Sequence, residues 1–433
     1  MNVLIIGNGG RENAIAWSVY ASPLLGKLFC MPGNPGIADY ATCIDGNILD
    51  NNEVYKCILE YSIDVVIVGP ETPLVNGIVD FLENKNIKVF GPSFSAAKLE
   101  GSKIFAREFC EKYSIPQPNF QSFSNIIKAQ SYIKSMDEKN GYVIKADGLA
   151  SGKGVVVTNN RNEALNYIND LMENEIFGDA GKNLLIEERL EGPEASIFAL
   201  SDGKNHILFS TAQDYKRVFE NNNGPNTGGM GSISPSPIID EMMLERISKE
   251  IISPVINGMR MEGTPFKGVL YTGIMISDKN PKVIEFNVRF GDPETQALLP
   301  RLKSDFLTAI LTTIDGGLEH FNLRWDDQIA LNVVLASKGY PGKYEINKRI
   351  KGLDVFKNDE LVFHAGTVKD QNEVLLTNSG RVLSVTALSE NIIDARKKVY
   401  ECVDKIKFDG CFFRTDIGNW LYFFSYFIEK IFY

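Results

Sequence analysis

Short runs of apolar residues alternate with longer amphipathic stretches through the first hundred positions of the chain. Four of these runs each end at a turn rich in glycine or proline, at residues 3–6, 28–31, 64–68 and 87–90. Continuous apolar runs separated by helical stretches are typical of a parallel sheet with helices on both faces. Ligands bind such sheets beyond the carboxyl ends of the strands, where these turns lie. The pattern predicts a substrate-binding N-terminal α/β domain at residues 1–105.

Three helices are expected in this region, at residues 11–20, 74–82 and 95–113. Pro116 and Pro118 follow, and they indicate a break between structural units because proline interrupts a helix. The strands expected next are short and apolar: 142–146, 155–158, 184–188, 195–200, 206–211, 269–276 and 282–288. A polar loop is expected at 214–232 and a helix at 240–259. Together these elements predict a second domain at residues 106–325.

The spacing of the hydrophobic positions changes again after Trp325. Alternating strands are expected at 329–336, 360–365 and 381–387, followed by a late helix at 391–406. This order predicts a C-terminal α+β domain at residues 326–420. The remaining residues, 421–433, form an aromatic tail that is too short to span a bilayer. We expect it to pack as a terminal helix on the body of the protein or on a partner subunit.

Composition narrows the class of protein. The 433 residues carry 45 basic and 55 acidic side chains, a net charge of −10, and 44% of them are hydrophobic. These values exclude wholesale disorder and give no overall field for nucleic acid or an anionic membrane. Six scattered cysteines without a CxxC pair indicate a reducing cytoplasm, and the N-terminus has no signal peptide. Three distant histidines make a zinc site or a histidine triad a poor explanation.

A glycine turn, Gly7-Asn8-Gly9-Gly10-Arg11-Glu12, follows the first strand. Glycines allow backbone N–H groups to approach an anion at a helix N-terminus. The third glycine of a dinucleotide fingerprint would fall at Glu12, and no acid stands about 20 residues further on. A nest for one phosphate, with Arg11 as an added cation, is favoured over a nicotinamide site. A merely tight turn is the alternative.

A lysine at the end of a strand precedes a second glycine-rich segment, Lys145-Ala146-Asp147-Gly148-Leu149-Ala150-Ser151-Gly152-Lys153-Gly154. No helix follows these glycines, so the segment is not a Walker loop. A loop of this kind between two strands folds over phosphates as a lid, with Lys145 as a point charge. A plain hairpin remains the alternative. The strand at 184–188 runs into a polar hinge that could present its backbone to adenine and a carboxylate to ribose.

Polar side chains alternate along a later strand, at Glu285, Asn287 and Arg289. Alternation places all three on one face of the strand. Carboxylate and amide oxygens suit Mg²⁺ that bridges the phosphates of a nucleotide, and an arginine can hold a carboxylate or a developing acyl phosphate. A strand with one solvent face would not explain the Gly-Asp-Pro-Glu turn that follows. The pattern favours a phosphoryl-transfer site.

In this order, the motifs resemble those of the ATP-grasp superfamily and, within it, the phosphoribosylamine–glycine ligase (GAR synthetase) family. The segments that carry the resemblance run from residue 1 to about Gly418: 7–12, 32–36, 69–71, 145–150, 226–231, 285–294 and 414–418. Asn13 and Tyr215 each stand where the family usually has histidine, and the aromatic tail has no counterpart. The resemblance implies an α/β multi-domain protein with a pre-ATP-grasp parallel-sheet domain. It also implies an ATP-grasp domain whose lid covers about 120–191, and the C-terminal α+β domain.

The resemblance further implies the ATP-dependent ligation of glycine to 5-phosphoribosylamine through glycyl phosphate, in purine biosynthesis. Lys103 and Lys145 would contact the nucleotide phosphates, and Glu194 the ribose. The other implied nucleotide contacts are the lid residues Ser151, Gly152, Lys153 and Gly154 and the hinge residues Glu187 and Leu190. Mg²⁺ or Mn²⁺ would lie on Glu285, Asn287 and phosphate oxygens, since the preceding strand offers no acid.

The remaining implied roles concern the reaction and its substrates. Arg289 would stabilise the acyl phosphate beside Lys145. Closure over the sugar phosphate would involve Asp214, Lys216, Arg217 and Gly229, although Lys216 and Arg217 could equally be a surface basic pair. The implied substrate contacts are Gly9, Gly10, Arg11 and Glu71 for phosphoribosylamine and Asp292, Pro293 and Glu294 for glycine. The expected partners are small molecules, not nucleic acid or membrane, and the expected state is a monomer or weak homodimer.

Three other functions compete with this interpretation. Another ATP-grasp ligase or a biotin-dependent carboxylase would share the nucleotide motifs, but the chain has no lysyl-biotin segment. A nicotinamide-dependent oxidoreductase depends on the first glycine turn alone. A non-catalytic nucleotide-binding regulator would keep the lysines but would not need Glu285, Asn287 and Arg289 together.

Overall fold

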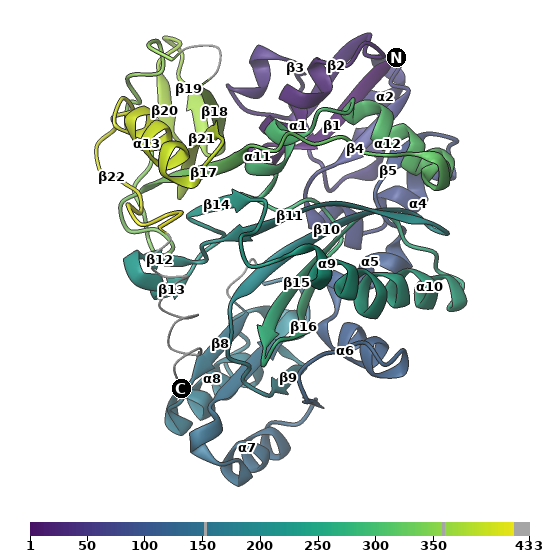
Figure 1. Ribbon diagram of the computed structural model, residues 1–433, viewed down its shortest axis with the longest axis vertical. Coiled ribbons are helices and arrows are strands. Elements are labelled where there is room, and N and C mark those ends of the chain that lie inside the picture. Colours follow the sequence, from purple (N-terminus) through teal and green to yellow (C-terminus); the bar gives the residue numbers. More distant parts are fainter. Residues whose placement is uncertain (151–153, 357–359, 420–433) are drawn as a thin grey trace.

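The structure is a computed structural model that describes residues 1–150, 154–356 and 360–419. The predicted lid residues Ser151, Gly152 and Lys153 and the aromatic tail lie outside these ranges. Figure 1 shows the N-terminal strands at one end of the molecule and a small sheet at the other, with a larger sheet between them. In the described ranges, no helix is both long and apolar enough to cross a bilayer.

The N-terminal sheet contains five parallel strands in the order β3-β2-β1-β4-β5. Their bounds are β1 (Asn2–Gly7), β2 (Lys27–Pro32), β3 (Thr42–Cys43), β4 (Val65–Val68) and β5 (Lys88–Phe90). Alternate residues of β1 enter two different cores, since Leu4 and Ile6 belong to one cluster and Val3 and Ile5 to another. Both faces are therefore covered, as the apolar runs predicted. The helices of this region include α1 (Gly10–Tyr20) and α2 (Asn51–Glu60).

Two predicted helices are each divided in the structure. The stretch 74–82 forms α3 (Glu71–Val75) and α4 (Ile78–Glu83), separated at Gly77, whose φ of 82° lies in the left-handed region. The stretch 95–113 forms α5 (Phe94–Gly101) and α6 (Lys103–Lys112). Ser102 lies between them with extended backbone, and its hydroxyl caps α6 by accepting the amide of Phe105 at 3.1 Å. The predictions of single helices were wrong because these local signals end each first helix.

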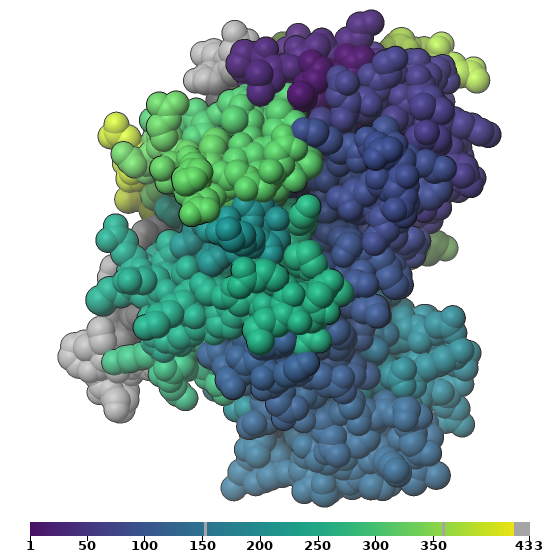
Figure 2. All heavy atoms as spheres, turned by 90° about the vertical axis from the view of Figure 1, so that its right-hand side faces the viewer, coloured from purple at the N-terminus to yellow at the C-terminus, as the bar shows by residue number. Residues whose placement is uncertain are grey.

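The stretch predicted as the lid contains a four-stranded sheet in the order β6-β9-β7-β8, with every pair antiparallel, and it is called the lid below. Its elements are β6 (Phe120–Phe123), α7 (Ile126–Ser135), β7 (Tyr142–Ala146), β8 (Val155–Thr158), α8 (Arg161–Met172) and β9 (Leu184–Glu187). The lid has its own apolar core, which includes Tyr142, Ile168 and Leu184. In the space-filling view, residues of this range protrude at the end opposite the first strands (Figure 2).

The central sheet has nine strands and continues into the C-terminal region. Along the sheet these are β16 (Asn280–Asn287), β15 (Lys267–Ser277), β10 (Glu194–Asp202), β11 (His206–Asp214), β14 (Gly231–Ser234), β17 (Ile329–Ser337), β21 (Arg381–Ser389) and β18 (Leu361–His364), with β22 (Cys411–Phe412) beside β17. Strand β14 joins the two halves because it pairs with both β11 and β17. The predicted domain boundaries stay predictions.

The stretch 214–232 is not the plain polar loop that was expected. It contains a hairpin of β12 (Arg217–Phe219) and β13 (Asn223–Asn226) before β14 begins. A second short hairpin, β19 (Thr367–Lys369) with β20 (Leu375–Thr377), was not anticipated either. The helices that flank these sheets are α9 (Glu241–Ile247), α10 (Ser253–Met261), α11 (Thr295–Leu298), α12 (Phe306–Asp315) and α13 (Ile392–Val403).

Candidate active site

A cavity of about 980 Å³ lies where the three sheets approach one another. The N-terminal region contributes Glu71 to its lining, the lid contributes Lys145, the central sheet Glu285, and the C-terminal strands Arg381. The carboxyl ends of the N-terminal strands therefore open toward the same space as the lid. Ligand sites commonly form where structural units meet, so this cavity is the candidate active site.

Most of the residues selected from the sequence lie around this cavity. They are Arg11, Glu71, Lys103, Lys145, Gly154, Glu187, Leu190, Glu194, Asp214, Lys216, Arg217, Glu285, Asn287, Arg289, Asp292 and Glu294. Gly9, Gly10, Gly229 and Pro293 do not line it and pack behind it. A side chain at Gly229, for example, would meet Pro293. The structure therefore brings the selected side chains together, while their individual roles stay predictions.

Glu285 and Asn287 face the cavity from β16, where they pair with Gly273 and Tyr271 of β15. The register shifts between Gly273 and Ile274, which marks a bulge in β16 beside Glu285. A side chain at Gly273 would lie 2.8 Å from Cγ of Glu285. Glycine at this position leaves room for the Glu285 side chain. A larger residue, such as a second acid, would collide with Glu285, which explains why the preceding strand carries no acidic ligand.

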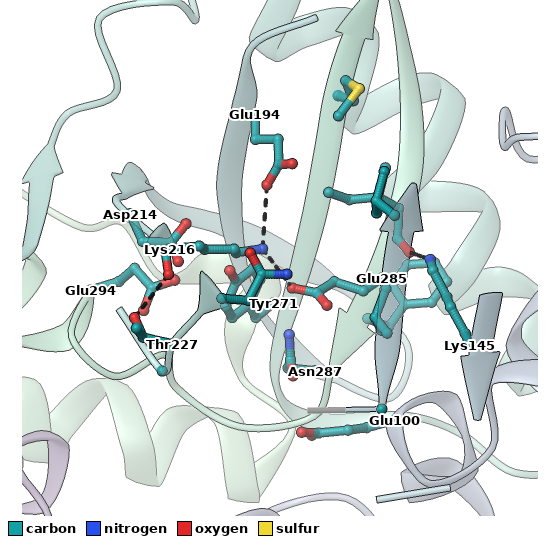
Figure 3. Close-up of a pocket in the computed structure, with 18 of the residues that line it drawn as sticks. Glu100, Lys145, Glu194, Asp214, Lys216, Thr227, Tyr271, Glu285, Asn287 and Glu294 are labelled. Carbon is teal, nitrogen blue, oxygen red and sulfur yellow. Dashed lines mark hydrogen bonds and ion pairs between the residues drawn. The ribbon is translucent and has the colours of Figure 1, made fainter. Parts of the chain in front are cut away.

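Lys216 reaches two carboxylates across the cavity (Figure 3). Its Nζ lies 3.1 Å from Oε1 of Glu285 and 3.4 Å from Oε2 of Glu194. Burial alone would lower the pKa of Lys216, but Glu285, Asp214 and Glu194 raise it well above its usual value. Lys216 in turn lowers the pKa of Glu285 to about 2. Lys216 therefore belongs to the cavity and not to an open surface.

Arg289 is held between two carboxylates of the N-terminal region. Its Nε lies 3.1 Å from Oε2 of Glu71, and one terminal nitrogen lies 3.3 Å from Oε1 of Glu100. The other oxygen of Glu100 accepts the amide of Val288 at 2.7 Å. Burial raises the pKa of Glu100 to about 7, whereas Arg289 and Arg11 outweigh burial and lower that of Glu71 to about 2. No local pattern in the sequence marks Glu100.

Glu187 forms a buried triad with Lys145 and Arg107. Its carboxylate lies 2.7 Å from Nζ of Lys145 and 2.7 Å from Nε of Arg107, and its side chain is 2% exposed. Arg107 also donates to the carbonyls of Val283 and Ile284, at 2.8 Å each. Any adenine contact at Glu187 would therefore fall to its backbone. Arg107 is a second residue that sequence reasoning missed.

The first glycine turn is already occupied by its own side chains. The amide of Gly9 donates to Oε2 of Glu12 at 2.7 Å, and Nε of Arg11 lies 2.5 Å from Oε1 of Glu12. Arg11 also donates to the carbonyl of Phe290 at 3.1 Å. The predicted phosphate nest consequently depends on the part of Arg11 that lines the cavity more than on the Gly9 amide.

The C-terminal strands supply one more cation, Arg381 at the start of β21. It donates to the carbonyls of Gly228 and Asp292, at 2.6 Å each, and lies 3.3 Å from Oδ2 of Asp292. Arg381 thereby joins the glycine loop to the Gly-Asp-Pro-Glu turn. No local pattern in the sequence marks it.

Three family models together match most of the chain. They describe the N domain, the ATP-grasp (A) domain and the C domain of phosphoribosylglycinamide synthetase, and they match residues 1–100, 101–295 and 330–420. The chain belongs to the phosphoribosylglycinamide synthetase family. The predictions of family, ATP-grasp fold, α/β multi-domain class and ATP-dependent ligase are confirmed.

Individual relatives of the phosphoribosylglycinamide synthetase family agree. A phosphoribosylamine–glycine ligase of Agrobacterium fabrum is 47% identical over 418 residues, which cover 96% of this chain and 98% of the relative. The crystal structure of the Thermotoga maritima phosphoribosylamine–glycine ligase aligns with a TM-score of 0.85 at 33% identity, covering 96% of this chain and all of the other. The biotin carboxylase domain of the Hydrogenobacter thermophilus 2-oxoglutarate carboxylase, solved with MgADP and bicarbonate, aligns at 0.72. At 16% identity over 95% of this chain and 91% of that domain, it shares only the fold.

The residues of this family member fit a divalent cation. Glu285 and Asn287 present a carboxylate and an amide oxygen to the cavity that also receives Lys103 and Lys145. Two protein oxygens suit Mg²⁺, which usually keeps several waters and binds substrate phosphates. In the described part of the chain, no group of three or more His, Cys, Asp or Glu residues could hold a metal. Phosphate oxygens would therefore have to complete the shell.

Replacing Glu187 by glutamine should destabilise the fold by about 3–5 kcal/mol, because Lys145 and Arg107 would remain buried without their counter-charge. In the folded state, the positive charges of Lys145 and Arg107 outweigh burial and lower the pKa of Glu187 to about 2. This is below the usual value of about 4.3, so the stabilisation is complete above that pH and is lost as pH falls toward 2.

Urea unfolding at several pH values measures this effect. The matched control is Glu191→Gln, since the Glu191 side chain is 81% exposed. The gap between the wild type and Glu187→Gln should be largest near pH 7 and should close as the pH is lowered below 4. Equal unfolding midpoints for the two variants at pH 7 would contradict the triad.

Proposed function

We propose that this chain joins glycine to 5-phosphoribosylamine and converts ATP to ADP and phosphate, which gives glycinamide ribonucleotide for purine biosynthesis. The proposal is supported by family membership and by relatives named as phosphoribosylamine–glycine ligases. The observation that carries it is the shared cavity, in which Glu285 and Asn287 of the central sheet lie with Lys145 of the lid and Glu71 of the N-terminal region. Arg289, two residues beyond the end of β16, lines the same cavity.

The chemistry requires activation because a carboxylate is a poor electrophile. An oxygen of the glycine carboxylate attacks the γ-phosphorus of ATP, the bond to ADP breaks, and glycyl phosphate forms. The amine of phosphoribosylamine then attacks the carbonyl carbon, and phosphate leaves with that oxygen while the amine loses a proton. Catalysis of this kind depends on positioning and charge neutralisation.

Several side chains have the charge and place for these tasks. Lys103 and Lys145 would neutralise the nucleotide phosphates, and Arg289 would stabilise the acyl phosphate. Burial raises the pKa of Asp214 to about 8, which suits proton exchange near neutral pH. A bound Mg²⁺ or Mn²⁺ held by Glu285 and Asn287 would neutralise further phosphate charge.

A coupled ADP assay with freshly made phosphoribosylamine, omitting each substrate in turn, tests the proposed function. ADP should form only when ATP, glycine and phosphoribosylamine are all present, and bicarbonate should not replace glycine. ADP release that requires bicarbonate would indicate a carboxylase. ATP binding without amine-dependent turnover would instead indicate a nucleotide-binding regulator.

We also propose that the protein works under reducing conditions, in the cytoplasm, as its cysteine usage predicts. All six cysteines are free thiols, and Cys30, Cys57, Cys110 and Cys402 are buried. The state of monomer or weak homodimer stays a prediction. The proposed partners are the three small-molecule substrates.

A further inference from the structure

The C-terminal motif Arg414-Thr415-Asp416-Ile417-Gly418 lies against the hairpin that follows Lys216. Figure 1 shows the chain after β22 running beside β12 and β13. The hairpin itself is exposed from Phe219 to Gly224. Lys216 nevertheless keeps a defined position at two carboxylates of the cavity. The Lys216 carbonyl accepts the amide of Thr227, at the far end of the hairpin, at 2.7 Å, so contacts that support the hairpin also bear on the position of Lys216.

Arg414 provides the first set of contacts. Its guanidinium is fully buried and binds both oxygens of Asp416, through Nε and one terminal nitrogen at 2.7 Å each. The other terminal nitrogen donates to the carbonyl of Arg217 at 2.9 Å and to Oδ1 of Asn222 at 3.1 Å. These bonds use four of the five N–H groups of an arginine. Although Arg414 borders the cavity, nearly all of its hydrogen-bonding capacity is therefore used within the protein and not for a ligand.

Asp416 provides the second set. Its Oδ2 accepts the amide of Asn221 at 2.9 Å. Asn221 and Asn222 both have positive φ angles, 59° and 52°, which non-glycine residues rarely adopt. The Arg414–Asp416 pair thus bonds to the hairpin turn at the two residues whose φ angles are positive.

Tyr215 provides the third set, and it precedes Lys216 directly. Arg414 lies 5.2 Å from the centre of the Tyr215 ring, within the range of a cation–π contact. The Tyr215 hydroxyl accepts the amide of Gly418 at 2.9 Å. The segment is in turn fixed to α13, because the Tyr400 hydroxyl donates to the carbonyl of Arg414 at 2.8 Å and accepts the amide of Ile417 at 3.2 Å. The departure from the family's usual histidine at position 215 is therefore explained by the bond of the Tyr215 hydroxyl to Gly418.

We infer that Arg414 and Asp416 are positioning residues for the ligation, which fix the hairpin and Tyr215 so that Lys216 reaches Glu285 and Glu194. The inference depends on the proposed function for its kinetic consequence only. A displacement of about 1 Å at a reacting site can lower a rate on the order of 100-fold. A lysine at position 414 keeps the charge but cannot form the bidentate pair.

The kinetic test compares Arg414→Lys and Asp416→Asn with Arg349→Lys, a matched control at an exposed arginine of the same region. We expect kcat to fall 10- to 100-fold in the first two variants, with the KM for glycine within about threefold of the wild type. In a Lys216→Ala background, Arg414→Lys should lower kcat no further, because it acts through Lys216. An equal loss of kcat in both backgrounds would overturn the inference.

The second readout does not depend on the reaction. Amide hydrogen exchange of residues 217–226 should be faster by about tenfold or more in Arg414→Lys and Asp416→Asn than in the wild type, because the hairpin opens locally more often, and unchanged in Arg349→Lys. Thermal unfolding of the same samples shows whether each variant is folded. Unchanged exchange in the hairpin of folded Arg414→Lys would overturn the inference even if the proposed reaction were wrong. If the wild-type protein shows no ligase activity while both variants show the expected faster exchange, only the proposed function is overturned.

Discussion

Replacing Glu285 by alanine is expected to lower glycine-dependent ADP release by about 10³-fold or more, while the protein stays folded. Glu285 combines the ion pair to Lys216 with the carboxylate proposed for the metal. Its side chain is 44% exposed and faces a glycine across the strand pair, so its removal leaves little buried surface unpaired. The change in the free energy of unfolding should therefore stay within about 1 kcal/mol.

The coupled ADP assay measures the loss, and the thermal midpoint measures folding. Glu245→Ala serves as the matched control, since Glu245 lies exposed on α9, away from the cavity lining. This variant should keep wild-type turnover. Unchanged turnover of Glu285→Ala would remove the metal assignment, and a loss accompanied by unfolding would remove the claim that Glu285 acts mainly in catalysis.

Replacing Arg289 by alanine should lower kcat on the order of 100- to 1,000-fold and change the KM for ATP much less. The charge that Arg289 is proposed to meet, on the acyl phosphate, develops only during the reaction. The variant also leaves Glu71 and Glu100 without their shared cation, and breaking such a buried pair typically costs about 3–5 kcal/mol. Stability should therefore fall together with kcat.

A second variant separates the two effects of Arg289. Arg289→Lys keeps a positive charge between the two carboxylates but cannot bond to both with a planar fork. It should recover most of the stability while kcat remains low. An effect confined to the KM for ATP, in either variant, would contradict the role at the acyl phosphate.

Patterns within one element were predictable from the sequence. The apolar runs of the N-terminal sheet gave its strands, and both faces of β1 are buried as a covered parallel sheet requires. Alternation correctly indicated that Glu285, Asn287 and Arg289 share one cavity, even though a bulge interrupts β16 nearby. The prediction that all three lie on the strand was wrong for Arg289, because β16 ends at Asn287. Ser102 was missed, yet a serine before a helical stretch is a recognisable N-cap.

Partners far apart along the chain were not predictable. Glu100 bonds to Val288, which is 188 positions away, and Arg414 bonds to Arg217 at a separation of 197. No periodicity or local motif records such a pairing, because it depends on how three sheets come together. Arg107 and Arg381 were missed for the same reason, since each looks like an ordinary helical or strand-end arginine until its partner is known.

In the proposed reaction, the γ-phosphoryl group of ATP is transferred to the glycine carboxylate before the amine attacks. Glycine labelled with ¹⁸O in its carboxylate tests this step directly, with the phosphate product analysed by mass spectrometry. One ¹⁸O atom should be transferred from glycine to each phosphate released, in a reaction that requires phosphoribosylamine. Phosphate without the label, formed at the same rate as ADP, would contradict it.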